Sequence, residues 1–131
     1  EYWGGLLSFI IEHTAGKLAK VNKYSDSSVH RLDHVVISTN DVEGFIKTYR
    51  DIFNIRLALD KFVEHWKKRM LFFRLNKTTI EVIEEKNQND AIDKLWGLAW
   101  NVSDLASCRE RLMKLGVDAT EIKKGFININ I

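Results

Sequence analysis

The sequence contains no proline, a single cysteine and no long apolar run. The missing proline carries no functional information. With only Cys108 available, the chain cannot build a disulfide framework or a cysteine-ligated zinc site, and a reducing compartment fits best. The apolar run Leu6–Ile11 is far shorter than the roughly 20 residues of a membrane helix, and it lacks the flanks of a signal peptide. We therefore expect a cytoplasmic protein with no membrane partner.

The charges are nearly balanced, with 20 Lys and Arg residues against 18 Asp and Glu residues. A net charge of +2 is too small to indicate a nucleic-acid partner. The length of 131 residues favours one domain, which is large enough to bury a core without disulfides. Because the chain begins with Glu1 instead of Met, we expect it to be a piece of a longer polypeptide.

Residues 32–60 and 95–123 read as two copies of one unit, in which an apolar strand is followed by a helix. Asp41 and Asp104 occupy equivalent positions 63 residues apart, each just before an apolar residue of the helix. At this offset His34 of the first copy corresponds to Gly97 of the second. The repeat predicts a fold of paired modules.

The hydrophobic periodicity predicts strands and helices in a repeated order. Asn40 is the expected N-cap of a helix that ends near Asn54, with Glu43 completing a capping box, and Ser103 or Asp104 caps a second helix that ends near Gly116. Strands are expected at 6–12, 31–38, 56–63, 69–75, 78–85, 97–102 and 117–123, and 125–131 is strand-like. The expected divisions are a strand at 1–13 that ends a preceding module, a linker at 14–30 and a domain at 31–131, with modules at 31–86 and 95–131.

Several short motifs resemble the glyoxalase/bleomycin-resistance/dioxygenase family, the vicinal oxygen chelate superfamily. They are Leu32–Ile37, Tyr49–Phe53, Thr79–Glu84 and Leu98–Leu105. The resemblance implies an α+β fold in which paired βαβββ modules form a curved mixed sheet around a cleft, with the helices outside and the second module incomplete here. It also implies a divalent metal held by residues from the first and last strands of each module.

Strand alternation assigns residues to the two faces of the predicted sheet. His34 and Ser38 on the first strand and Glu81 on the last would face the cleft. The family pattern then makes His34 and Glu81 metal ligands, with Glu81 also the catalytic base. An imidazole and a carboxylate suit Zn, Fe, Mn or Ni. His34 could equally be a hydrogen-bonded structural residue.

The second module departs from the family pattern at Gly97, which has no side chain to coordinate a metal. Two protein ligands are too few for a catalytic zinc site. A further ligand could come from His13, from Glu12, from a neighbouring domain or from a second copy of the chain. The metal site therefore looks incomplete in this sequence.

Arg74, Phe72 and Ser38 are the candidate substrate-binding residues. Arg74 has the strand parity of Phe72 and could bind a carboxylate in the cleft, or it could be an exposed arginine at the sheet edge. The expected partners are a small molecule in the cleft, and either a second copy in a homodimer or an adjoining domain of the same kind in a tandem protein.

The resemblance implies a metal-dependent lyase, isomerase or dioxygenase that acts on a small carbonyl or oxo-acid compound. Two alternatives stay open. One is a metal-free binding domain of the same fold, like the drug-resistance proteins of the family. The other is a catalytically silent half of a tandem protein.

Overall fold

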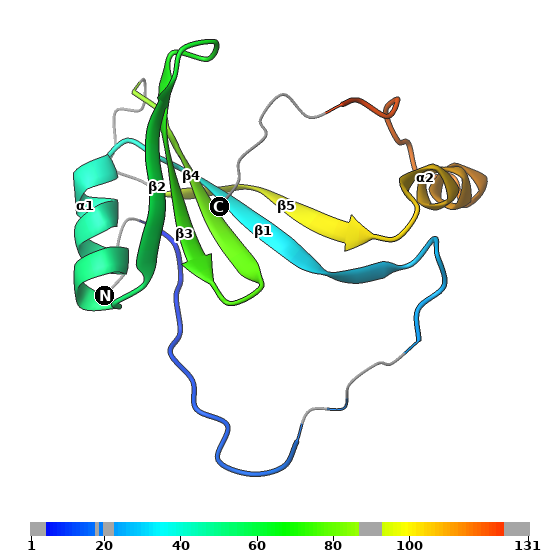
Figure 1. Cartoon of the computed structure of the whole chain (residues 1–131), viewed down its shortest axis with the longest axis horizontal. Helices are drawn as coiled ribbons and strands as arrows, with labels where there is room; N and C mark the ends of the chain where they lie inside the picture. The colour runs from blue at the N-terminus through cyan, green and yellow to red at the C-terminus, as the bar shows by residue number, and fades with distance from the viewer. Residues whose placement is uncertain (1–4, 18, 20–22, 87–92, 125–131) are drawn as a thin grey trace. The chain divides into compact units, whose positions relative to one another are not determined.

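The computed structural model describes residues 5–17, 19, 23–86 and 93–124. In chain order (Figure 1), the elements are β1 (Val29–Thr39), α1 (Val42–Ile46), the π-helical segment η1 (Lys47–Ile52), β2 (Arg56–Val63), β3 (Lys68–Leu75), β4 (Thr78–Glu84), β5 (Lys94–Val102) and α2 (Leu105–Lys114). The sequence predicted each of these helices and strands in this order. The first βαβββ module is complete, and β5 with α2 begins a second.

The strands form one mixed sheet in the order β2-β3-β4-β1-β5. The β2–β3 and β3–β4 pairs are antiparallel, whereas β1 and β4 are parallel. A parallel pair needs a crossover connection, which α1 and η1 begin on one face of the sheet (Figure 1). The closing strand of the first module therefore lies beside the opening strand.

The helix after β1 begins one residue later than expected, because Asp41 and not Asn40 is the N-cap. The Asp41 carboxylate accepts a hydrogen bond of 2.9 Å from the Gly44 amide. The Thr39 hydroxyl in turn accepts a bond of 3.0 Å from the Asp41 amide. A Cβ at Gly44 would clash with the Asp41 carboxylate, so a larger residue there would displace the capping side chain.

The hydrophobic core lies between the sheet and the α1–η1 helix. Its seven buried members are Ile37, Val42, Phe45, Ile46, Leu71, Phe73 and Val82. Val35 and Ile80 pack against this cluster, and the Phe45 and Tyr49 rings stack with centroids 4.0 Å apart. The alternation that predicted Val35, Ile37, Ile80 and Val82 on the helix side is therefore confirmed.

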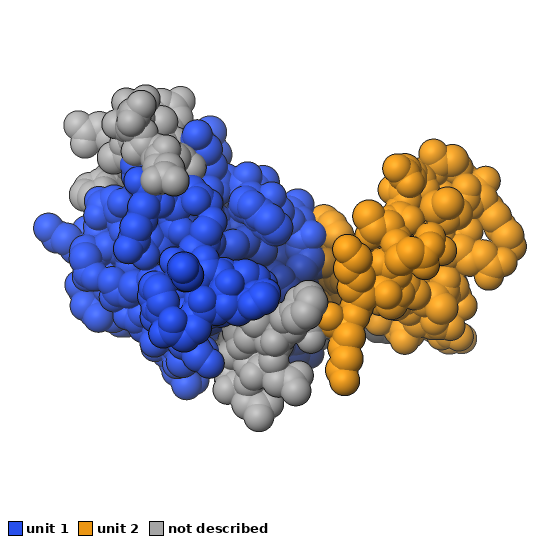
Figure 2. Space-filling model, turned by 90° about the horizontal axis from the view of Figure 1, so that it is seen from above, with its two compact units in different colours: residues 1–12, 32–99 blue, residues 13–31, 100–131 orange. Residues whose placement is uncertain are grey.

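The described chain divides into two compact units, residues 1–12 with 32–99 and residues 13–31 with 100–131 (Figure 2). In the second unit, the Asp104 carboxylate caps α2 by accepting from the amides of Ala106 and Ser107. The Asp104 amide donates to the Asp26 carbonyl at 3.1 Å, and Arg111 donates to the Ser27 carbonyl. These bonds tie the turn before β1 to the start of α2.

Two predicted strands do not form. The segment predicted as a strand at 6–12 has only an isolated bridge at Leu6, and Phe9 and Ile10 are 75% and 86% exposed. The segment 117–123 is irregular, and Arg109 donates to the carbonyls of Ala119 and Thr120 within it. The strand-like segment 125–131 lies outside the described residues. No helix in the described ranges is long and apolar enough to cross a membrane.

Asp93, just before β5, is a half-buried carboxylate that accepts a hydrogen bond from Thr39. Burial raises the pKa of Asp93 above its ordinary value, and the nearby charge of Asp41 adds to the rise. As the pH rises past the pKa in the unfolded chain, the unfolded state releases this proton first. The free energy of unfolding therefore falls through that pH window.

We expect the Asp93→Asn variant to have a higher Tm than the parent at about pH 7 and the same Tm at about pH 3, where both side chains are neutral. Asparagine keeps an oxygen that can accept from Thr39. Thermal unfolding followed by circular dichroism measures the difference, with exposed Asp118→Asn as the control. A gain in Tm that is equal at both pH values would contradict this account.

Candidate functional site

The face of the sheet opposite α1, here called the distal face, carries the candidate site residues in cross-strand rows. Strand register aligns Arg74, Thr79 and His34 in one row of β3, β4 and β1. The next row holds Phe72, Glu81 and Val36, and a third holds Met70, Ile83 and Ser38. Residues directly opposite one another share a face, so all nine side chains belong to the distal face.

His34 and Glu81 meet on this face from adjacent rows. The Nε2 atom of His34 lies 3.7 Å from a carboxylate oxygen of Glu81. The two side chains are 33% and 19% exposed, so water reaches the pair only in part. Burial raises the pKa of the Glu81 carboxyl group, and the charge of His34 partly offsets that rise. The structure thus brings together the two residues that the sequence singled out.

Asp33 orients the His34 ring. Its carboxylate lies 3.1 Å from Nδ1 of His34, on the side of the ring away from Glu81. A carboxylate accepts hydrogen bonds and does not donate them, so Nδ1 carries the proton in the neutral ring. The Nε2 lone pair then points toward Glu81, where it can accept a proton or bind a metal.

Two arginines lie at the end of the distal face beyond Glu81. Arg56 on β2 is directly opposite Arg74 on β3. Arg74 donates a hydrogen bond of 2.8 Å to the Thr79 hydroxyl. A register shift between Leu57 and Leu59 marks a β-bulge, and it places Arg56 on the same face as Arg74.

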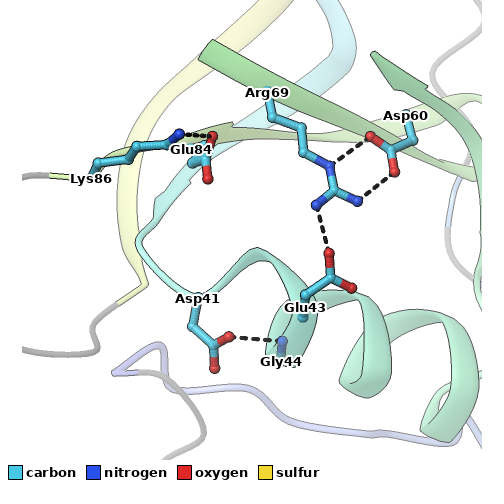
Figure 3. Close-up of polar contacts among 7 residues, drawn as sticks. All are labelled: Asp41, Glu43, Gly44, Asp60, Arg69, Glu84 and Lys86. Carbon is cyan, nitrogen blue, oxygen red and sulfur yellow. Dashed lines mark hydrogen bonds and ion pairs between the residues drawn. The ribbon is translucent and has the colours of Figure 1, made fainter. Parts of the chain in front are cut away.

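On the helix side of the sheet, Arg69 is paired with acidic side chains (Figure 3). Arg69 makes a two-point contact with the Asp60 carboxylate at 2.9 and 2.7 Å and also bonds Glu43 at the start of α1. Glu84 pairs with Lys86 on the same side. The ion pairs of Arg69 therefore link α1 to the sheet, which is a structural role for this arginine.

The remaining candidate residues are either buried or not placed beside His34 and Glu81. Phe72 and Ser38 lie on the distal face but are only 3% and 5% exposed. Gly97 on β5 has open space where a Cβ would stand. His13 and Glu12 are exposed.

The His34–Glu81 pair fits two ligands of a divalent metal. Two donors that each lie roughly 2.1 Å from a tetrahedral ion are about 3.4 Å apart, close to the observed separation. Across the described ranges, no group of three or more His, Cys, Asp or Glu side chains converges to complete such a site. The pair alone supplies fewer protein ligands than the usual three.

The sequence matches the model of the glyoxalase/bleomycin resistance protein/dioxygenase superfamily over residues 33–131. The chain belongs to this superfamily. The match begins within β1 and covers the rest of the first module, β5 and α2. A comparison with curated proteins gives no match.

Solved structures of the superfamily fold resemble the chain. A methylmalonyl-CoA epimerase from Mycobacterium tuberculosis aligns with a TM-score of 0.63 and 24% identity, over 82% of this chain and 79% of that one. A Streptomyces coelicolor methylmalonyl-CoA epimerase (E43Q) in complex with 2-nitronate-propionyl-CoA gives 0.59 and 16%, over 76% and 82%. At these identities the similarity establishes the fold, so the α+β, glyoxalase-like prediction is confirmed.

Asp33 and Arg56 are candidate site residues that the sequence did not indicate. Strict alternation points Asp33 away from His34, although its carboxylate reaches the Nδ1 atom. The only signal for Asp33 was its place directly before the candidate histidine. Arg56 gave no signal, because its face depends on the bulge in β2.

We expect the Asp33→Ala variant to lose the preference of His34 for the Nδ1–H tautomer, because the acceptor at Nδ1 is gone. Nitrogen-15 NMR of the imidazole ring at about pH 8, where histidine is neutral, measures the tautomer ratio. Asp33→Asn keeps an acceptor oxygen and should preserve the ratio. His30 serves as an internal control, since it contacts Tyr24 and Ser103 instead. An unchanged ratio in Asp33→Ala would show that Asp33 does not orient the ring.

Proposed function

We propose that the protein is a glyoxalase-fold isomerase that moves a proton at a carbon next to a carbonyl group. The observation that carries the proposal is the contact between Glu81 and His34 on the distal face. A half-buried carboxylate beside an oriented imidazole is a suitable acid–base pair for such a reaction.

Glu81 is the proposed base. Its raised pKa brings its proton affinity closer to neutral pH, where a base can both accept a proton and return it. The carboxylate takes the proton from the carbon, and the C–H electron pair moves into the carbonyl group to form an enolate. Return of the proton from Glu81 to the same face gives the starting compound, and delivery of a proton to the opposite face by water or a second acid gives the isomer, after which Glu81 releases its proton to solvent.

His34 supports this step from Nε2, with Asp33 holding the ring in place. His34 and Glu81 are also the residues that would hold a divalent metal, completed by at least one ligand beyond this pair. A bound metal would polarise the carbonyl oxygen and stabilise the enolate charge. Glu81 would then be a ligand, a base or both.

The solved structures of similar fold support the substrate class. They are methylmalonyl-CoA epimerases, and one of them is in complex with methylmalonyl-CoA and NH4+, at a TM-score of 0.56 and 16% identity over 70% of this chain and 73% of that one. Epimerisation beside a carbonyl is the proton transfer that Glu81 is suited to perform. We propose a small carbonyl compound, such as an acyl thioester or an oxo acid, as the substrate.

Isotope exchange tests the proton transfer directly. The protein is incubated in D₂O with a panel of acyl-CoA thioesters and 2-oxo acids, and deuterium at the carbon next to the carbonyl is measured by mass spectrometry. We expect Glu81→Gln to slow the exchange by about 10² to 10⁴-fold, the usual contribution of a general base.

Glu84→Gln is the matched control, because Glu84 lies on the same strand but on the helix side, paired with Lys86. It should exchange at the parent rate. Exchange that is the same in Glu81→Gln and the parent, or absent with every compound of the panel, would overturn the proposal.

The amount of bound metal distinguishes the metal-dependent isomerase from a metal-free binding domain. After dialysis against Zn²⁺, Ni²⁺, Mn²⁺ or Fe²⁺, we expect one of these ions to remain at a near-stoichiometric level. His34→Ala and Glu81→Ala should each abolish binding, whereas His30→Ala should not. A parent protein that retains none of the four ions while still binding a carbonyl compound would favour the binding domain.

A further inference from the structure

Arg56 and Arg74 form a pair of like charges on the distal face. They are directly opposite one another on antiparallel strands, where Cβ atoms are typically about 5 Å apart. Like charges in this position destabilise a sheet unless something neutralises them. The bulge between Leu57 and Leu59 turns both side chains to the same face.

Within the described residues, neither arginine contacts a carboxylate. Arg74 uses a single donor on the neutral Thr79 hydroxyl, although a guanidinium has five. Three other arginines do pair with acidic side chains, Arg50 with Asp51, Arg69 with Asp60 and Glu43, and Arg109 with Glu121, whereas Arg111 bonds the Ser27 carbonyl. Intramolecular charge pairing is therefore available elsewhere on this chain but is not used at Arg56 and Arg74.

We propose that Arg56, Arg74 and the Thr79 hydroxyl form a receptor for an oxyanion, either a carboxylate or a phosphate, carried by the molecule on which Glu81 acts. The planar fork of a guanidinium donates two parallel hydrogen bonds to such a group. The Thr79 hydroxyl accepts from Arg74 and is only 6% exposed, so the two guanidinium groups are the main donors to the anion, and the hydroxyl holds Arg74 in place.

The position of the receptor limits the size of the substrate. Thr79 and Glu81 are two residues apart on β4 and share a face, which places them about 7 Å apart at roughly 3.3 Å per residue. His34 lies beside Thr79 in the same row. A molecule that contacts both sites must carry its anionic group a few bonds from the carbonyl. The inference about substrate size rests on the proposed function. Anion binding by the two arginines does not depend on it.

Anion binding can be measured without any catalytic assay. The full chain is titrated with malonate and, separately, with inorganic phosphate at constant ionic strength, using NMR chemical shifts of the arginine side chains. We expect one or both anions to bind, and Arg56→Gln and Arg74→Gln each to weaken binding at least tenfold. Arg50→Gln removes the same charge from the helix side and should bind as the parent does.

Thermal unfolding gives a second readout. In chloride buffer Arg56→Gln should have a Tm equal to or above that of the parent, because the like-charge pair is relieved. Added anion should then raise the Tm of the parent but not that of Arg56→Gln. Stronger binding of malonate identifies a carboxylate as the ligand group, and stronger binding of phosphate identifies a phosphate.

The receptor is overturned if neither anion binds the parent, or if both arginine variants bind as well as Arg50→Gln. Glu81→Gln should keep full anion binding. Anion binding without isotope exchange on any compound would leave the receptor standing and reject the proposed isomerase, and the reverse result would reject the receptor alone.

Discussion

The parallel pairing of β1 with β4 is the contact on which the candidate site depends. It aligns Val36 with Glu81 and Ile37 with Val82, so the core side chains of both strands face α1 together. A slip of one residue would turn Val82 out of the core and Glu81 into it. Burial of the apolar face therefore fixes the register, and the register places Glu81 within 3.7 Å of His34. Packing of the core on the helix side therefore determines which side chains meet on the distal face.

The arginines on the two faces of the sheet differ in how their charge is balanced. On the helix side, Arg69 is neutralised by Asp60 and Glu43, and the network joins α1 to β2 and β3. On the distal face, Arg56 and Arg74 are opposite one another without an acidic partner in the described part of the chain. A folded protein gains nothing in stability from such a pair, so its presence is better explained by what it binds than by what it supports.

Alternation and spacing were enough to predict the first module and its two faces, because strand side chains repeat with a period of two. That period placed His34 and Glu81 on the same face. It fails for Arg56: Leu59 is opposite Phe72 on the distal face, so strict alternation would put Arg56 on the helix side, and only the bulge reverses this. It also fails for segment 6–12, where a strand-like composition finds no partner strand beyond an isolated bridge. The local hydrophobic pattern does not show where a strand has a bulge or whether a segment finds a strand to pair with.

Gly97 shows that the asymmetry of the repeat is not a steric necessity. Its backbone does not have a positive φ, and a Cβ added there would meet open space. Glycine in a strand costs roughly 0.5–1 kcal/mol relative to alanine, and no close packing repays that cost at this position. An alanine could therefore be introduced at Gly97 without a clash of its Cβ. The second copy keeps the strand backbone at the position equivalent to His34 but has no side chain there, so Gly97 is a suitable position at which to introduce a new ligand residue.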